Sequence, residues 1–303
     1  MIDKWIFNEV VPPEMANQPL RFLLHQYWLI PKHLIFSLRH NQRVLVNGQY
    51  LPVNFPVHTG DRIQMTFLPQ DFGQPYPEVL VDSAATIEVL YEDRNLIVIN
   101  KRRGDKTHAN QPGEVGATMN HLAAYLQAED IPPYMIHRLD QETSGAIVFA
   151  KNPAVVPILV ANIAKKVIQR TYLAWVSGTN LESIGKINLP IGLDPDDKRK
   201  RKVNGPHAVN AVTHYQVIRE EKCFSLLSIQ LETGRTHQIR VHMAAINHPI
   251  VGDPLYNPND QYEYLLLHSW KLGLVMPFTN RLQTVIAPIP SHFLRFEQFL
   301  LEK

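Results

Sequence analysis

Apolar residues recur at two different spacings along this chain, and each spacing predicts a different kind of element. Residues 19–29, PLRFLLHQYWL, and residues 31–42, PKHLIFSLRHNQ, carry apolar positions three and four apart, which is typical of amphipathic helices. The runs on either side of Asn47 and Gly48 alternate apolar and polar residues, and this dipeptide favours a tight turn between strands. A second turn is expected at Gly60, before RIQMTFL. We therefore expect two short helices followed by a small sheet.

After residue 80 the alternating runs become longer. Two strands are predicted around the charged turn of TIEVLYEDRNLIVINK, and a hairpin is predicted from AVTHYQVIRE and FSLLSIQLETG. SGAIVFAK and RTYLAWVSG are predicted as further strands, whereas GATMNHLAAYLQAED, PAVVPILVANIAKK and RTHQIRVHMAAIN have helical spacing. Long strands mixed with a few helices predict an α+β fold with a mostly antiparallel sheet.

A proline-rich segment separates these two parts. Residues 68–80, LPQDFGQPYPEVL, hold three prolines and one glycine, and no helical or strand period continues across them. A chain of 303 residues also has two domains as its default expectation. We therefore predict a small domain over residues 1–75 and a larger one over residues 76–303.

The amino-acid composition indicates the cellular compartment and excludes disulfides and thiolate metal sites. The single cysteine, Cys223, permits neither an intramolecular disulfide nor a thiolate metal cage, and its strand-like surroundings predict a buried, inert thiol. The N-terminal residues show no signal-peptide pattern, and the longest apolar stretch is about half of what a bilayer requires. We expect a soluble, cytoplasmic protein. A net charge of +2 permits nucleic acid as a partner without requiring it.

The most crowded polar stretch is HRLDQETSG, residues 137–145, directly before a predicted buried strand. Asp140 lies at this boundary, where burial or a nearby cation can change its protonation. Arg138 lies two positions away and would share a face with Asp140 in an extended segment. The alternative is structural, with Asp140 and Thr143 capping a turn while Arg138 pairs with Glu142.

A second polar cluster lies in LETGRTHQIRVH, residues 231–242. Gly234 allows a tight turn out of the preceding strand, and several donors then follow at the start of a predicted helix: Arg235, His237, Gln238, Arg240 and His242. A helix N-terminus with arginines suits a phosphate, or a carboxylate that requires a partner. The alternative is a solvated helix face, although apolar residues interrupt the charges with an amphipathic period.

Tyr172 lies in the strand RTYLAWVSG among apolar neighbours. It is either a core tyrosine with a satisfied hydroxyl group or an aromatic platform, or proton acceptor, beside a planar ring.

Two basic runs, NKRRGDK at residues 100–106 and DDKRKRK at residues 196–202, are consistent with contacts to a phosphate backbone. The 14 histidines form no tight metal-ligand motif, and no phosphate-binding glycine-rich loop is present, so neither a metal nor a nucleotide cofactor is expected.

Taken with their order and spacing, these segments resemble the RluA branch of the pseudouridine synthases. HRLDQETSGAIVFAKN resembles the motif of the catalytic aspartate, RTYLAWVSG the tyrosine strand, and LETGRTHQIRVHMAAINHPIVGDPLY the third motif. LLLHSWKLGLVMPFT is similar to the C-terminal segment that lines the uridine pocket, so that the resemblance covers residues 86–290. The first 75 residues resemble an S-four-like RNA-binding domain, except that the usual Arg-Leu-Asp before the first helix is Pro-Leu-Arg here.

The resemblance implies isomerisation of uridine to pseudouridine in ribosomal or transfer RNA, without a cofactor. A monomer is the simpler expectation for the oligomeric state. Asp140 would act as nucleophile or base, Arg235 would keep it ionised, and Tyr172 would stack on the uracil and accept a proton from carbon five. The remaining substrate contacts that it implies are Arg138, which would fill the gap left by the flipped base, Leu266 or Leu267 on the other face of the ring, and the motif residues His137, Thr143 and Gln238. Of these, His137 and Thr143, together with Ser144, are expected to shape the turn.

One loop departs from the family. The usual Lys-Pro-Ala-Gly and Val-His-Pro become NKRRGDKTHAN, which retains Lys101, Gly104 and His108 but neither proline. Two other functions remain open at this point. The chain could be an RNA-binding protein with an inactive synthase domain, or a hydrolase that uses Asp140 and His137.

Overall fold

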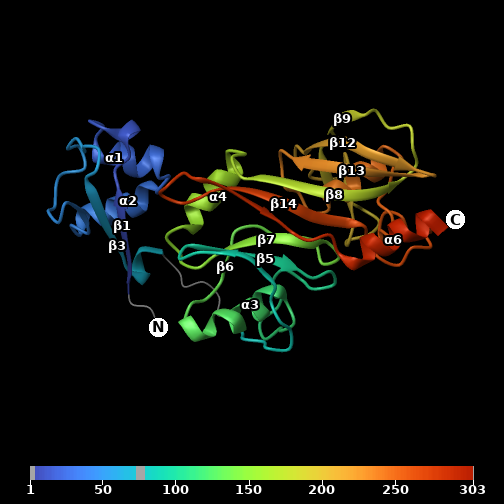
Figure 1. Ribbon diagram of the computed structural model, residues 1–303, viewed down its shortest axis with the longest axis horizontal. Helices are drawn as coiled ribbons and strands as arrows, with labels where there is room; N and C mark the ends of the chain where they lie inside the picture. Colours follow the sequence, from blue (N-terminus) through green and yellow to red (C-terminus); the bar gives the residue numbers. More distant parts are fainter. Residues whose placement is uncertain (1–3, 73–78, 303) are drawn as a thin grey trace.

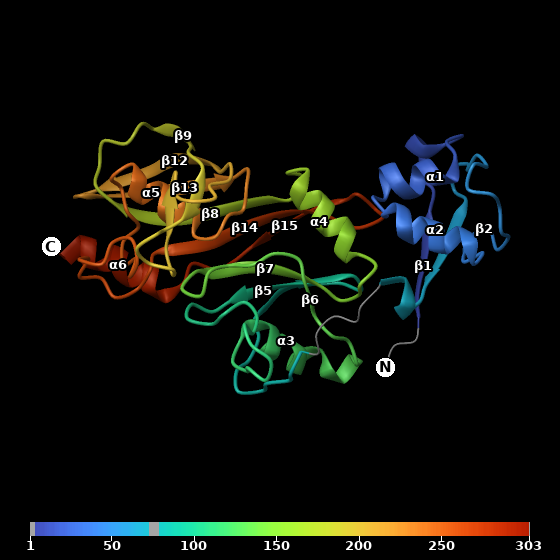
Figure 2. The same cartoon turned by 180° about the vertical axis from the view of Figure 1, so that it is seen from behind.

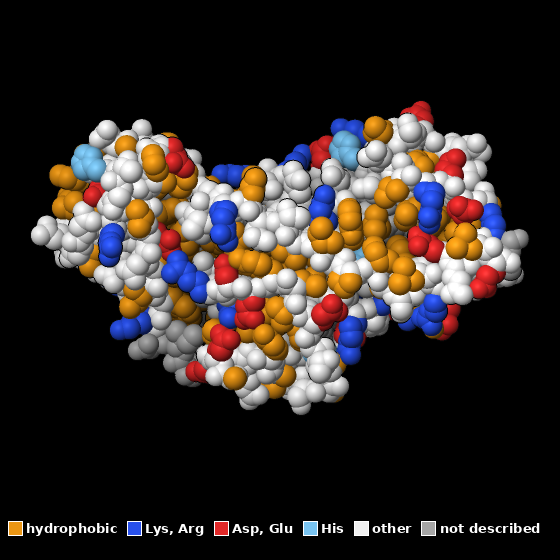
Figure 3. Space-filling view, in the orientation of Figure 1, with side chains coloured by type: hydrophobic (Ala, Val, Ile, Leu, Met, Phe, Trp, Pro, Cys, Tyr) orange, Lys and Arg blue, Asp and Glu red, His pale blue; other side chains and the backbone are white. Residues whose placement is uncertain are grey.

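The computed structural model describes residues 4–72 and 79–302. It has two parts, a small N-terminal unit and a larger unit built on one extended sheet (Figure 1). The predicted boundary at residues 75 and 76 lies outside the described residues. The space-filling view shows the N-terminal unit and the far half of the larger unit rising on either side of a saddle (Figure 3).

The N-terminal unit packs helices on a three-stranded antiparallel sheet of order β1-β3-β2. Its elements are β1 (Trp5–Val10), η1 (Pro13–Met15), α1 (Leu20–Phe22), the π-helical turn η2 (Leu23–Tyr27), α2 (Lys32–His40), β2 (Val44–Val46), β3 (Arg62–Phe67) and η3 (Pro69–Phe72). The turn predicted at Asn47 and Gly48 is present, with φ of 50° and 82°. The strand β1 was not predicted, and it pairs with β3 along its whole length.

The larger unit contains a ten-stranded sheet within the described residues, with the path β4-β5-β7-β14-β8-β13-β12-β9 and with β6 and β15 attached to β7 and β14. The strands are β4 (Val89–Glu92), β5 (Leu96–Lys101), β6 (Tyr134–Met135), β7 (Ser144–Ala150), β8 (Gln169–Ser177), β9 (Ile184–Asn188), β12 (Val212–Glu221), β13 (Phe224–Leu231), β14 (Leu267–Val275) and β15 (Leu282–Ile286). All the pairings are antiparallel except that of β7 with β14. The predicted α+β class with a mostly antiparallel sheet is confirmed.

Helices cover both faces of this sheet. They are α3 (Thr118–Leu126) with the short η4 (Gln127–Glu129), α4 (Val156–Ala164), α5 (Gln238–Ala245) and α6 (Ser291–Glu302), and a small hairpin of β10 (Ile191–Leu193) and β11 (Arg201–Val203) lies beside α5. Alternate side chains of β5 point to opposite faces of the sheet and belong to two different hydrophobic cores. Ile97 and Ile99 pack towards α3, whereas Leu96 and Val98 join the core that includes α4. Both ribbon views show α3 on the outer side of β5 and β7 (Figures 1 and 2).

The N-terminal unit is docked on the tip of the β14–β15 hairpin. Phe278 from this tip packs against the rings of Phe7 and Trp28, with centroids 4.9 and 5.8 Å away. Arg94 of the larger unit forms an ion pair with the nearly buried Glu9 of β1. One continuous hydrophobic core therefore joins the two units.

The parallel contact between β7 and β14 is unusually close at one residue. Gly145 has φ of +109°, and a Cβ atom there would lie 2.2 Å from the carbonyl oxygen of Ser269. Only glycine fits this conformation and this spacing. The loop that precedes β7 therefore lies close to the first residues of β14.

Cys223 is exposed in the turn between β12 and β13. The prediction of a buried thiol was wrong, because the apolar run that follows Cys223 enters the sheet only at Phe224.

Candidate active site

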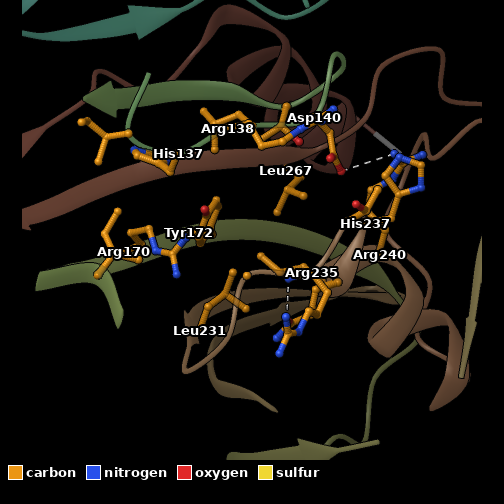
Figure 4. Close-up of a pocket in the computed structure, with 18 residues that line it drawn as sticks. His137, Arg138, Asp140, Arg170, Tyr172, Leu231, Arg235, His237, Arg240 and Leu267 are labelled. Atoms are coloured by element: carbon orange, nitrogen blue, oxygen red, sulfur yellow. Dashed lines mark hydrogen bonds and ion pairs between the residues drawn. The ribbon is translucent and has the colours of Figure 1, made fainter. Parts of the chain in front are cut away.

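The polar stretches predicted from the sequence meet around one cavity of about 330 Å³ (Figure 4). Its walls come from the loop between β6 and β7, from the end of α4, from β8, from the end of β13 with the turn into α5 and the first residues of α5, and from the start of β14. The lining residues used below are His137, Arg138, Asp140, Thr143, Arg170, Tyr172, Leu231, Arg235, His237, Gln238, Arg240 and Leu267. A cavity of this size with a few converging polar groups is typical of a small-ligand site.

Asp140 is paired with Arg240 and not with Arg235. The Nη1 atom of Arg240 lies 3.5 Å from the Oδ2 atom of Asp140 (Figure 4). Arg235 is exposed at the edge of the cavity, and its Nε donates to the carbonyl oxygen of Asn210 at 3.0 Å. The expected partner was therefore the wrong arginine, although both lie in the predicted motif.

Arg240 is fixed in place by Asp253 and Tyr256. Its Nε and Nη2 atoms donate to the two carboxylate oxygens of Asp253, each at 2.7 Å, and Asp253 is fully buried. The ring of Tyr256 covers the guanidinium group at 5.2 Å. A bidentate pair of this kind fixes both the position and the plane of the arginine. Arg240 therefore presents a fixed positive charge to Asp140.

Tyr172 and Leu267 provide apolar surface in the cavity. Tyr172 lies on β8 opposite Ile229 of β13, and only 4% of it is exposed. Burial raises the pKa of its hydroxyl group. Leu267 opens β14 and lines the cavity, whereas Leu266 packs on Trp175 and Phe293 in a separate core cluster. Of the two leucines left open by the sequence, only Leu267 faces the cavity.

His137 is not paired with Asp140. Its Nε2 atom accepts the backbone N–H of Val148 at 3.3 Å, and burial lowers its pKa to about 3. The ring is therefore neutral and contributes to the architecture of the loop. This arrangement does not form the water-activating pair that a hydrolase with Asp140 and His137 would require.

Two other predicted residues are engaged in supporting contacts. Gln238 accepts from the hydroxyl of Thr233 and the N–H of Arg235, and its amide donates to Val212 and Thr213. Its amide thus shapes the turn before α5. Thr143 is buried, and its N–H donates to the carbonyl oxygen of Asp140 at 3.1 Å, which closes the turn.

Arg138 is exposed and lies at the edge of the cavity. The alternative pairing of Arg138 with Glu142 is not present, because Glu142 contacts Arg103.

Lys101 anchors the Asp140 loop from the neighbouring strand. Its side chain is 1% exposed, and its Nζ donates to the carbonyl oxygens of Arg102, Gln141 and Thr143, each at 2.9 Å. Burial lowers the pKa of this amine to about 8. The lysine thus ties the residues that directly follow Asp140 to the end of β5.

The cavity residues that were not assigned a site role include Arg170, Leu231, His237 and Arg240. Arg170 lies two positions before Tyr172 on β8, so the alternation of a strand could have placed it on the same face. His237 has a left-handed backbone, with φ of +57°, and its Nδ1 lies 3.0 Å from the hydroxyl of Tyr256. No local pattern indicated that conformation.

The two basic runs differ in the structure. In the first, Arg102, Arg103 and Lys106 are each paired with a nearby carboxylate. In the second, which leads into β11, Lys198 and Lys202 are exposed.

The described part of the chain contains no group of three or more potential metal ligands, and none of its helices is long and apolar enough to span a membrane.

The chain is similar to known proteins of one family. The family model described as RNA pseudouridylate synthase matches residues 95–245, and that of the RluD ribosomal pseudouridine synthase N-terminal domain matches residues 7–63. The chain is 34% identical to the uncharacterised RNA pseudouridine synthase YhcT of Bacillus subtilis, over 95% of this chain and 90% of the relative. It is 32% identical to the ribosomal large subunit pseudouridine synthase D of Borreliella burgdorferi, over 82% of this chain and 79% of the relative.

Solved structures show the same fold. Human RNA pseudouridylate synthase domain containing 4 superposes with a TM-score of 0.58 at 24% identity, covering 71% of this chain and 93% of that one. Human RNA pseudouridylate synthase domain containing 1 gives the same TM-score at 22% identity, covering 76% and 98%. The chain belongs to the RNA pseudouridine synthase family and is an isomerase that acts on RNA.

Proposed function

We propose that uridine is isomerised in the cavity around Asp140. The observation that carries this assignment is the carboxylate of Asp140 held beside the fixed guanidinium of Arg240. In the reaction the bond between the uracil nitrogen and the ribose breaks, the ring turns, and carbon five bonds to the ribose. Carbon five loses a proton and the released nitrogen gains one, so that no other reactant is consumed. A carboxylate in this cavity can act as nucleophile on the sugar or as base.

The apolar surfaces suit a flat ring. Tyr172 and Leu267 both line the cavity, and each offers a face to a uracil. Because burial raises the pKa of Tyr172, its phenol is neutral near pH 7 and would have to lose its own proton before accepting another. We assign the stacking role to Tyr172 on this ground.

The test removes one charge from the loop. RNA labelled with tritium at carbon five of uridine, isolated from cells that lack the protein, releases the label on isomerisation. Asp140→Asn should abolish release while RNA binding is retained. The matched control is Glu142→Gln, which neutralises a carboxylate two positions away that faces Arg103, and it should retain most of the activity. Turnover by the Asp140→Asn enzyme would refute the assignment, and so would full binding without activity in the unaltered protein, which is the outcome expected of an inactive synthase domain.

Arg138 is our candidate for the residue that replaces the flipped base. Its side chain is exposed at the edge of the cavity, whereas its neighbour Leu139 is buried. Extracting a base from a helix costs a few kcal/mol, and an inserted side chain can offset part of it. Arg138→Ala should therefore reduce activity on structured RNA more than on an unpaired strand, and equal losses would contradict this role.

We propose ribosomal RNA as the substrate, bound by the N-terminal unit and by the basic segment that leads into β11. Support comes from the match of residues 7–63 to the RluD N-terminal domain and from relatives described as ribosomal large subunit pseudouridine synthase D. We further propose that the protein acts in the cytoplasm as a monomer. Mapping pseudouridines with and without the protein decides the substrate, because loss of sites from transfer RNA alone would exclude ribosomal RNA.

A further inference from the structure

A threonine outside the cavity is hydrogen-bonded to the backbone that carries Asp140. The hydroxyl group of Thr107 donates to the carbonyl oxygen of Leu139 at 2.7 Å, and its oxygen accepts the N–H of Leu139 at 3.1 Å. Both residues are buried, with exposures of 3% and 4%. One side chain therefore satisfies both backbone groups of the residue between Arg138 and Asp140.

These two contacts restrict the orientation of Asp140. The N–H of Leu139 belongs to the peptide group shared with Arg138, and its carbonyl belongs to the peptide group shared with Asp140. Each peptide group is planar, so fixing one atom in each limits the rotation of both planes. The direction in which the carboxylate of Asp140 leaves the backbone depends on the second of these planes.

Thr107 is itself attached to a rigid element. Its carbonyl oxygen accepts the N–H of Met119 at 3.1 Å, and the carbonyl oxygen of Lys106 accepts the N–H of Thr118 at 2.8 Å. Both donors lie in the first turn of α3, whose buried residues include Leu122 and pack in the core beneath β5 and β7. A continuous series of contacts thus runs from α3 through Thr107 to the Asp140 loop.

We propose that Thr107 is a positioning residue for Asp140, an inference that rests on the role assigned above to that carboxylate. Thr107 stands where the related motif has the valine of Val-His-Pro, and the chain lacks both prolines of this loop. Valine has no hydroxyl to offer the Leu139 backbone. In this chain, hydrogen bonds from a side chain supply part of the rigidity that proline rings would provide.

The test removes the hydroxyl group and the methyl group of Thr107 in separate variants. Thr107→Val keeps the shape of the side chain and removes both hydrogen bonds, whereas Thr107→Ser keeps the hydroxyl and removes the methyl group. Single-turnover rates are measured with enzyme in excess over RNA labelled at carbon five of uridine, together with RNA binding and thermal unfolding. We expect the maximal rate of Thr107→Val to fall about tenfold, since small misplacement of a catalytic group costs up to about 100-fold. Thr107→Ser should stay within about twofold of the unaltered protein, with RNA affinity unchanged in both.

Other outcomes overturn the proposal. An unchanged maximal rate for Thr107→Val, an equal loss in Thr107→Ser, or a loss confined to RNA affinity would each do so, as would a fall in melting temperature without a fall in rate. If Thr107→Val does not fold, Thr107→Ala and Thr107→Ser form a second pair that differs by the hydroxyl alone. Asp140→Asn separates this inference from the proposed function: an inactive Asp140→Asn with a fully active Thr107→Val leaves the carboxylate's role intact and removes only that of Thr107.

Discussion

Replacing Lys101 with methionine should destabilise the protein and slow its reaction, because this lysine connects the end of β5 to the loop of Asp140. The substitution keeps an apolar stem of similar length and removes the ammonium group. Three backbone carbonyls, those of Arg102, Gln141 and Thr143, then lose their donor. The side chain is almost completely buried, so the freed carbonyls are not readily satisfied by water.

The size of the effect follows from two opposing contributions. A hydrogen bond from a charged donor contributes about 2 kcal/mol, so three contribute about 6 kcal/mol. Burial of the ammonium opposes this, since it lowers the pKa of Lys101 from 10.5 to about 8. That shift corresponds to about 3 kcal/mol at about 1.4 kcal/mol per unit. The expected net loss in the free energy of unfolding is therefore about 3 kcal/mol at pH 7.

Urea denaturation at pH 7 measures this loss, and the single-turnover rate reports the accompanying displacement of Asp140. The matched control is Lys106→Met in the same loop, whose partner is the surface residue Glu114. That pair is partly exposed, so its removal should cost less than about 1 kcal/mol. If Lys101→Met and Lys106→Met are equally stable, or if Lys101→Met keeps the full rate, the anchoring function assigned to Lys101 is wrong.

Two further predictions concern buried charge and pH. Arg240→Gln should abolish activity and lower the free energy of unfolding by about 3–5 kcal/mol, because it leaves the carboxylate of Asp253 buried without a partner. The control, Arg235→Gln, should leave the free energy of unfolding within about 1 kcal/mol of that of the unaltered protein. If urea denaturation shows Arg235→Gln to be the less stable variant, the pairing of Arg240 with Asp253 and Asp140 is misassigned. His268 is fully buried, its Nδ1 lies 2.9 Å from the Ser144 hydroxyl, and burial lowers its pKa to about 4. The unfolded chain takes up this proton first as the pH falls from 6.5 towards 4, so up to about 3 kcal/mol of stability is lost in that window. His268→Asn should flatten this part of the stability curve, and an unchanged curve would contradict the assignment.

The catalytic loop could be predicted because its chemistry is concentrated in nine consecutive residues. The partner of Asp140 could not, because two arginines of one motif compete for the role. The spacing predicts a helix from Arg235 onward, but the left-handed backbone of His237 delays its start to Gln238. Arg240 consequently lies on a buried turn of α5, while Arg235 remains in the exposed approach to it.

Other features depended on contacts distant in the sequence. Adjacent residues of a strand face opposite sides, so Leu266 and Leu267 were equally plausible until the neighbours of β14 were known. The strand β1 buries Glu9, a charged side chain that an alternation pattern counts as exposed, and its partner Arg94 lies 85 residues away. Long-range pairing decided both cases.

The docking of the N-terminal unit on the β14–β15 tip sets the distance between that unit and the cavity. The strand β14 begins at Leu267 in the cavity and ends beside that tip, and its nine residues extend about 27 Å. An RNA bound by the N-terminal unit would place a uridine beside Asp140 only if that uridine lies at this distance from the bound segment. The length of the hairpin would therefore select a target uridine by its distance from the RNA segment that the N-terminal unit binds, as well as by its local sequence.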